Sequence, residues 1–183
     1  MSFDLADFSY SRQRAAARAV AQRRHFTIGV GGQTIGLPVD CVKTIFHIER
    51  LTPVPLAARE IAGLANLRGR IVTAVHLDRC LGMGDNADAA PSRLAVGVEH
   101  NGEDYALLVD ETGDVVISEE ADRIAAPAHL DARLLELFAA CYRSDDGFLS
   151  VLDIDALVRR LSKQSELSFR DGMTKNHNNG AKQ

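Results

Sequence analysis

Apolar and polar residues alternate in short runs along most of this chain. Apolar residues occupy every second position of 26–30 and again of 35–39, with the pair Gly31–Gly32 between the two runs. This period of two is typical of a β-strand that buries one face. Adjacent glycines supply the backbone angles of a tight hairpin turn. The pattern predicts a β-hairpin with the inward residues Phe26, Ile28, Val30, Ile35, Leu37 and Val39.

The same succession of features occurs a second time in the later half of the chain. Alternation returns at 94–98 and continues to Val109 beyond the turn Asn101–Gly102. Each copy then passes a Val-Asp pair and a further apolar strand, at 42–46 or 114–117, and reaches a hairpin turn that contains a glycine, Gly69 or Gly147. The preserved order predicts an internal duplication. Residues 83–92, rich in glycine, proline and small polar residues, predict the linker between the copies.

Short strands separated by turns, with no alternating helices, predict an all-β sandwich or barrel. A short helix is expected through Leu157, Val158 and Leu161, because Asp153 or Asp155 can accept hydrogen bonds from its first turn. Residues 131–138 are ambiguous. Helix propensity is favourable at their start, whereas the duplication places a strand at 137–142.

The two ends of the chain differ from the part between them. Residues 1–24 are alanine-rich and contain five arginines, which predicts an exposed extension of helical character. A targeting peptide, a membrane-surface helix and a nucleic-acid arm are alternatives, although Asp4 and Asp7 are unusual in the first and the alanines give the second a weak apolar face. Residues 162–183 are polar and predict a disordered tail.

Composition restricts the class of function. The 183 residues are 46% hydrophobic and 25% charged, which is ordinary for a soluble globular protein. A net charge of −4 argues against general nucleic-acid binding. Three cysteines, an odd number without a secretory leader, predict reduced thiols in a cytosolic protein. No apolar run reaches the roughly 18 residues that a membrane span needs.

The sequence contains no motif that indicates catalysis or cofactor binding. The glycines at 29–32 lack the spacing of a phosphate loop, and no Gly-x-Ser-x-Gly elbow or catalytic cysteine signature is present, although a Ser-His-Asp set cannot be judged from sequence. His76, Asp78 and Cys80 would share one face of a continuous strand, but ligands in a row enclose a metal poorly. We therefore expect no enzyme activity, no metal and no cofactor.

The segment 61–82 carries residues that strand packing does not require. Asn66 and Arg68 precede a turn at Gly69, where each is a turn former, a solvated side chain or, for Arg68, a five-donor fork for a partner's carboxylate. Together with Gly63 and the apolar run from Ile71, this string resembles the signature of the CheW family, and the resemblance extends over about 26–161. These proteins couple chemoreceptors to the chemotaxis histidine kinase.

The resemblance implies two small five-stranded, SH3-like β-barrels, related by an approximate two-fold axis, with a hydrophobic groove between them. The barrels would be 25–82 and 93–161, with short helices at the ends. It also implies partners: the cytoplasmic tips of methyl-accepting chemoreceptors and the regulatory domain of a CheA-type kinase, at arrays beneath the inner membrane. The implied partner-binding residues are Val42, Ile45 and Phe46 beside the receptor groove, Asn66, Leu67, Arg68 and Gly69 at the turn, and Ile71 toward the kinase.

Three departures from the family pattern bear on the partners. An acid common near Thr44 is missing, so Arg68 either finds another internal acceptor or is freer to meet a partner. The usual Asp-Leu-Arg appears as His76-Leu77-Asp78, and Ala106 replaces a glycine. The alternatives to a receptor–kinase adaptor are a stand-alone interaction module built on the same fold and a small β-barrel nucleic-acid binder.

Overall fold

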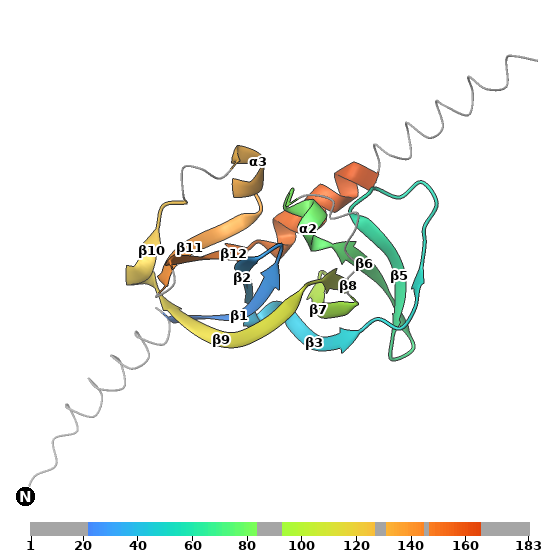
Figure 1. The fold of residues 1–183 in the computed structure, drawn as a ribbon, viewed down its shortest axis with the longest axis horizontal. Helices are drawn as coiled ribbons and strands as arrows, with labels where there is room; N and C mark the ends of the chain where they lie inside the picture. The colour runs from blue at the N-terminus through green and yellow to red at the C-terminus, as the bar shows by residue number, and fades with distance from the viewer. Residues whose placement is uncertain (1–21, 84–92, 127–130, 145–146, 166–183) are drawn as a thin grey trace, which may run out of the picture.

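The strands form two sheets packed side by side in the computed structural model, which describes residues 22–83, 93–126, 131–144 and 147–165 (Figure 1). Each sheet has six strands. The first sheet has the order β10-β11-β12-β2-β1-β9, and the second has the order β3-β7-β8-β6-β5-β4. The strands of the first sheet are β1 (Gln22–Val30), β2 (Gln33–Pro38), β9 (Glu111–Glu119), β10 (Arg123–Ile124), β11 (Phe138–Ser144) and β12 (Gly147–Leu152). Those of the second are β3 (Val42–His47), β4 (Leu51–Thr52), β5 (Ile61–Leu67), β6 (Arg70–His76), β7 (Leu94–His100) and β8 (Glu103–Leu108).

The two sheets do not coincide with the two halves of the chain. The β1–β2 hairpin pairs with β9 and β12 from the later half, and the β7–β8 hairpin pairs with β3 and β6 from the earlier half. The predicted barrels at 25–82 and 93–161 are therefore corrected: each copy contributes its first hairpin to the other copy's sheet. Residues 84–92, most of the predicted linker, lie outside the described residues.

The exchange is symmetric, which supports the predicted duplication. Each exchanged hairpin joins its host sheet through one parallel pairing, β2 with β12 and β8 with β6. The all-β class with two small β units and short helices is confirmed. In the described residues each sheet has six strands rather than five and is open, because its two end strands do not pair with each other.

The short helices lie where the chain leaves the strands. These are α2 (Leu77–Cys80), α3 (Ala132–Leu135), the 3-10 turns η1 (Val39–Cys41) and η2 (Glu120–Asp122), and a helix at 154–165. Asp153 begins the last of these, since its Oδ1 accepts a hydrogen bond of 3.0 Å from the N–H of Ala156. The ambiguous segment contains a helix at its start and a strand from Phe138. The predicted boundaries shift at the ends: β1 already begins at Gln22, and the last helix continues to 165, while the rest of the extension and tail lies outside the described residues.

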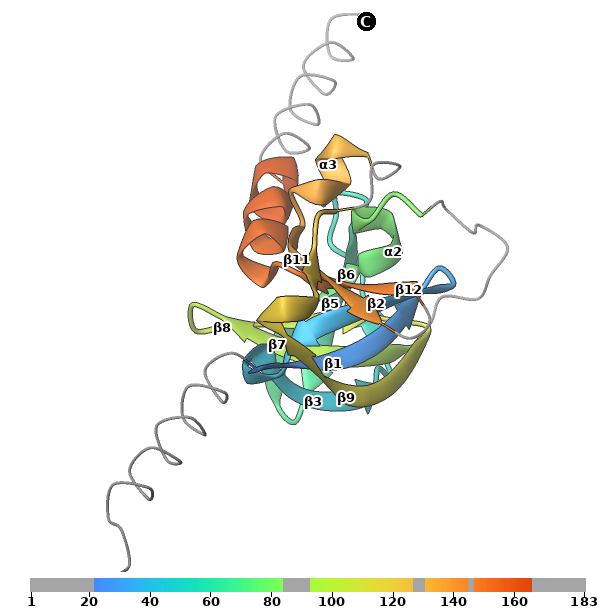
Figure 2. The ribbon, with the colours of Figure 1, turned by 90° about the vertical axis from the view of Figure 1, so that its left-hand side faces the viewer.

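Two apolar clusters hold the sheets together. The larger one lies between the sheets and combines residues of both with α2 and the helix 154–165, including Leu37, Leu107 and Leu157. The smaller one belongs to the second sheet and consists largely of small residues such as Ala74 and Ala106. Figure 2 shows the helix 154–165 and α2 at one end of the molecule, away from β3 and β9. Because the larger cluster spans both sheets, their relative position is fixed by core packing.

The inner face of the first sheet is partly polar. The His25 side chain is only 3% exposed, and neither of its ring nitrogens has a hydrogen-bond partner in the described structure. Its ring lies 5.3 Å from the ring of Tyr142 on β11. Burial, and then the nearby charge of Arg23, lower the pKa of His25 below its usual value. The folded protein therefore holds this imidazole in its neutral form.

Acidification is expected to destabilise the protein through His25. The unfolded chain takes up a proton near the ordinary histidine pKa of about 6.5, whereas the folded state resists it, so stability is full above that pH and falls below it by up to about 1.4 kcal/mol per pH unit. Urea unfolding at pH 7.5 and 5.5 measures this slope. His25→Phe is expected to flatten it, and His47→Gln, at an exposed histidine, is the control. An unchanged slope in His25→Phe would assign the acid sensitivity to other groups.

Candidate functional site

β3 presents one side chain of the predicted groove set to solvent. Its residues alternate between half-buried and exposed positions, and Ile45 is 46% exposed. Val42 packs against the cluster between the sheets, and Phe46 packs against the cluster of the second sheet. Lys43 beside Ile45 pairs with Glu99 on β7, at 3.0 Å between Nζ and Oε2. Of the three groove residues predicted on this strand, Ile45 is therefore the one most available to a partner.

The turn between β5 and β6 is built by its own sequence. Arg68 and Gly69 both have positive φ, 52° and 87°, as a two-residue hairpin turn requires. The N–H of Gly69 donates a hydrogen bond of 2.7 Å to Oδ1 of Asn66. Asn66 is therefore a turn former, and Leu67 is half-buried against the second sheet's cluster. Gly69 has a conformational role, since it supplies a φ that other residues seldom adopt.

Arg68 projects from this turn into solvent. It is exposed, and it has no ion-pair or hydrogen-bond partner among the described residues. Thr44 on β3 offers no carboxylate to it. Both views place the turn on the same lower side of the molecule as β3 (Figures 1 and 2). Within the described structure, the guanidinium is thus available to an external acceptor.

Ile71 is the most exposed large apolar side chain in the described residues, at 74%. It lies opposite Asn66 in the β5–β6 ladder and beside a shallow hollow of about 390 Å³. Polar groups surround that hollow. Arg70 Nη1 lies 2.9 Å from Asp104 Oδ2, and the Tyr105 hydroxyl donates a bond of 2.6 Å to Glu103. Burial, then the hydrogen bond to Glu103, raise the pKa of Tyr105 to about 12, so this hydroxyl stays protonated. An apolar centre with a polar rim is the usual anatomy of a protein interface.

A second exposed apolar strand was not predicted as part of a site. Val115 and Ile117 on β9 share one face and are 46% and 62% exposed. They stand opposite Phe26 and Arg24 of β1 in the ladder. Alternation located the strand at 114–117 but could not tell a buried face from an exposed one. The duplication carried the missing signal, because it matches 114–117 with the predicted groove strand at 42–46.

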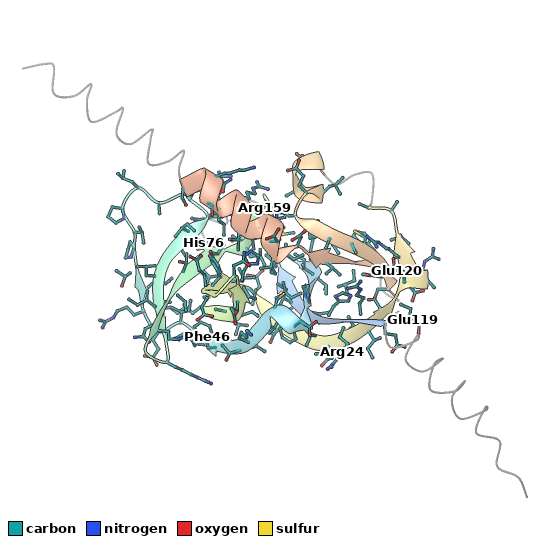
Figure 3. All side chains as sticks on the ribbon, turned by 180° about the vertical axis from the view of Figure 1, so that it is seen from behind. Arg24, Phe46, His76, Glu119, Glu120 and Arg159 are labelled. Carbon is teal, nitrogen blue, oxygen red and sulfur yellow. The ribbon has the colours of Figure 1, made fainter. Side chains whose placement is uncertain are left out.

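β3 and β9 are the end strands of their sheets and lie along the same side of the molecule. Figures 1 and 2 both place them on its lower side, and Figure 3 shows Phe46 and Arg24 along that side from behind. We call the exposed residues Ile45, Val115 and Ile117 the lower apolar surface. Exposed apolar side chains on end strands are candidates for protein-interaction sites in soluble proteins.

The structure does not bring His76, Asp78 and Cys80 together as a metal site. α2 begins at Leu77, so the three side chains do not share a strand face, and His76 Nδ1 lies 3.9 Å from Asp78 Oδ1. Cys80 is buried, and that burial raises the pKa of its thiol to about 12. Among the described residues no group of three His, Cys, Asp or Glu side chains is placed to hold a metal ion. The helices of this part of the chain are also too short or too polar to span a membrane.

Comparison with known proteins gives one consistent family. Residues 24–162 match the CheW-like domain. Chemotaxis protein CheW of Thermotoga maritima is 21% identical over 159 residues, which cover 81% of this chain and 96% of that protein. Chemotaxis protein CheW of Treponema pallidum is 25% identical over 146 residues, covering 77% and 86%. Protein FrzA of Myxococcus xanthus is 31% identical over 83 residues, covering 45% and 52%.

The fold has a solved counterpart. The crystal structure of the scaffolding protein TtCheW from Thermoanaerobacter tengcongensis superposes with a TM-score of 0.62 at 21% identity, covering 72% of this chain and 88% of that one. At this identity the likeness establishes the architecture of the two sheets.

Proposed function

This chain belongs to the CheW-like family, and from that premise we propose that it is a non-catalytic adaptor that couples chemoreceptors to a CheA-type histidine kinase. The observation that supports the proposal most directly is that large apolar side chains are exposed on more than one strand. One set, Ile45, Val115 and Ile117, lies on the end strands, and the other, Ile71, follows the β5–β6 turn. An adaptor needs two surfaces that can be occupied together.

The lower apolar surface is the proposed site for the receptor tip. A receptor's helical hairpin can place an apolar stripe along such a surface, and polar groups at the rim set its register. Lys43 lies on β3, and Arg68 lies at the β5–β6 turn on the same side of the molecule. Both can meet carboxylates or carbonyls of that hairpin. Val42 and Phe46 support the strand from beneath because they pack into the two clusters.

Ile71 is the proposed centre of the kinase contact. The regulatory domain of a CheA-type kinase resembles this fold, so the contact would join one small β unit to another. The ion pair of Arg70 with Asp104 and the hydroxyl of Tyr105 would form the polar rim. An adaptor with both contacts would sit at receptor arrays beneath the membrane. It would change kinase activity by binding one state of the receptor or kinase more tightly than the other.

Co-sedimentation tests the proposal. The purified protein is mixed with membranes that carry the organism's chemoreceptors, with and without its histidine kinase. Pelleting that requires receptors and strengthens with kinase is expected. No pelleting with any receptor or kinase would contradict receptor–kinase coupling and leave the chain as a stand-alone interaction module of the same family.

Ile71→Asp is expected to weaken kinase binding at least about tenfold, because a carboxylate replaces the apolar centre of the contact, while receptor-dependent pelleting stays unchanged. Titration with the isolated regulatory domain measures the affinity. Leu56→Asp, at an apolar residue 59% exposed in the loop before β5, is the matched control. Equal affinities of Ile71→Asp and wild type would remove Ile71 from the kinase surface.

A further inference from the structure

The first strand begins beside the end of β9. Gln22 stands opposite Glu119 in the ladder, and its Nε2 donates a hydrogen bond of 3.2 Å to the Glu119 carboxylate. Figure 3 shows Glu119 and Glu120 at this end of the first sheet, with Arg24 on the lower side of the molecule. Residues 1–21, outside the described part of the chain, are therefore attached at the end of the strand that carries Val115 and Ile117.

The segment before this attachment point is basic, and the end of β9 beside it carries carboxylates among the arginines Arg23, Arg24 and Arg123. Residues 11–21 contain Arg12, Arg14 and Arg18 and no acidic residue. The end of β9 and the adjoining η2 contain three carboxylates within four residues, Glu119, Glu120 and Asp122, of which Glu120 also pairs with Arg123 at 3.0 Å. A segment of this length spans about 15 Å as a helix and about 35 Å when extended, so its arginines can reach these carboxylates. Single exposed ion pairs are weak, but a short tether raises the local concentration of one partner about the other.

The exposed face of β9 and the segment 1–21 also both carry apolar residues. Ile117, 62% exposed, precedes Glu119 by two positions on β9, and Val115 continues the same face. Beyond its arginines the extension carries four large apolar or aromatic residues, Phe3, Leu5, Phe8 and Tyr10. Folded proteins usually cover exposed apolar residues on an end strand, because such strands otherwise pair with other chains. The apolar residues at 3–10 belong to a segment that joins the described chain beside the end of that strand.

We propose that residues 1–21 dock on the outer face of β9. The arginines lie against the carboxylates of Glu119, Glu120 and Asp122, and the apolar residues of 3–10 lie over Val115 and Ile117. One consequence rests on the proposed function: the docked segment covers part of the lower apolar surface and competes with the receptor. The docking itself does not depend on any receptor.

Chemical labelling of a cysteine on β9 tests the docking without a partner. Ile117→Cys is made in a Cys41→Ser background, since Cys41 is half-buried and Cys80 and Cys141 are buried. The rate of modification by N-ethylmaleimide is compared between the full chain and a chain that begins at Gln22. Truncation is expected to raise the rate about fivefold, which corresponds to a docked state about four times as populated as the open one. Replacing the three arginines with glutamine, or adding 0.5 M salt, is expected to raise the rate in the full chain, because either removes the charge attraction.

Two controls make the result specific. Ile71→Cys, on the other sheet, is expected to react at the same rate with and without residues 1–21. The ratio at Ile117→Cys is expected to survive twentyfold dilution, because the contact lies within one chain. Equal rates in the full and truncated chains would overturn the docking, and a ratio that disappears on dilution would overturn it in favour of a second copy of the chain. Failure of receptor binding would leave the labelling result intact and would count only against the proposed function.

Discussion

Receptor binding is expected to fall more than a hundredfold in the double variant Ile45→Asp, Ile117→Asp, with the fold unchanged. The two side chains are 46% and 62% exposed and come from the end strands of different sheets. Substitutions at such exposed positions seldom change stability by more than about 0.5 kcal/mol. A carboxylate buried without a partner in an apolar interface costs roughly 1.5–3 kcal/mol at each site, and two such sites exceed a hundredfold.

Titration with a soluble cytoplasmic receptor fragment measures this loss, and thermal unfolding checks the fold. The single variants separate the two strands. If the receptor hairpin lies across both sheets, each single variant loses about half of the binding free energy lost by the double variant, because the sites are separate. Full binding by Ile117→Asp would confine the receptor to β3. Full binding by the double variant would remove the lower apolar surface from the receptor proposal altogether.

The matched control for this experiment is Phe148→Asp. Phe148, at 39% exposure, is an apolar residue of similar accessibility on β12, which β2 and β1 separate from β9 in the first sheet. It receives the same charge change in the same protein. Loss of binding in this variant as well would indicate a general effect of net charge on association rather than a local contact.

Strand positions were predictable because alternation of apolar and polar residues is the period of a β-strand. The runs at 26–30, 42–46, 94–98 and 114–117 all fall in strands of the structure. Alternation does not report which strand pairs with which, and both copies carry equivalent hairpins. The exchange of the β1–β2 and β7–β8 hairpins between the copies therefore had no local signal, and the division into sequential barrels was wrong for that reason.

The candidate site was predictable only in part. Ile45, Arg68 and Ile71 are exposed, as partner-binding residues must be, whereas Val42, Phe46 and Leu67 are half-buried supports. Asn66 and Gly69 serve the geometry of the turn. The exposure of Val115 and Ile117 was not predicted, because an exposed apolar face and a buried one have the same period. Exposure depends on which elements pack over a strand, and that is a property of the tertiary structure.

Gly63→Ala is expected to destabilise the protein by about 3 kcal/mol or more, although this glycine contacts no proposed partner. Gly63 lies at a bulge of β5 with φ of +142°, and an added Cβ would stand 2.5 Å from the backbone oxygen of Thr52 on β4. A backbone atom held in a ladder cannot rotate away as a flexible side chain can. Either the β4–β5 pairing breaks or β5 shifts, and β5 leads directly into the turn at Arg68.

Gly32→Ala separates two causes of this loss of stability, the backbone strain at a positive φ and the clash of the added methyl group with β4. Gly32 has a φ of +75°, but an added Cβ there would meet no atom within 4 Å, so only the backbone strain of about 1 kcal/mol applies. The midpoint temperature of thermal unfolding is expected to fall by about 6–12 °C in Gly63→Ala and by about 2–4 °C in Gly32→Ala. Equal shifts would show that β4 yields to the methyl group without cost. A larger shift for Gly63→Ala would explain this position of the family string as a steric requirement of the β4–β5 contact, distinct from the surface role proposed for Arg68 and Ile71.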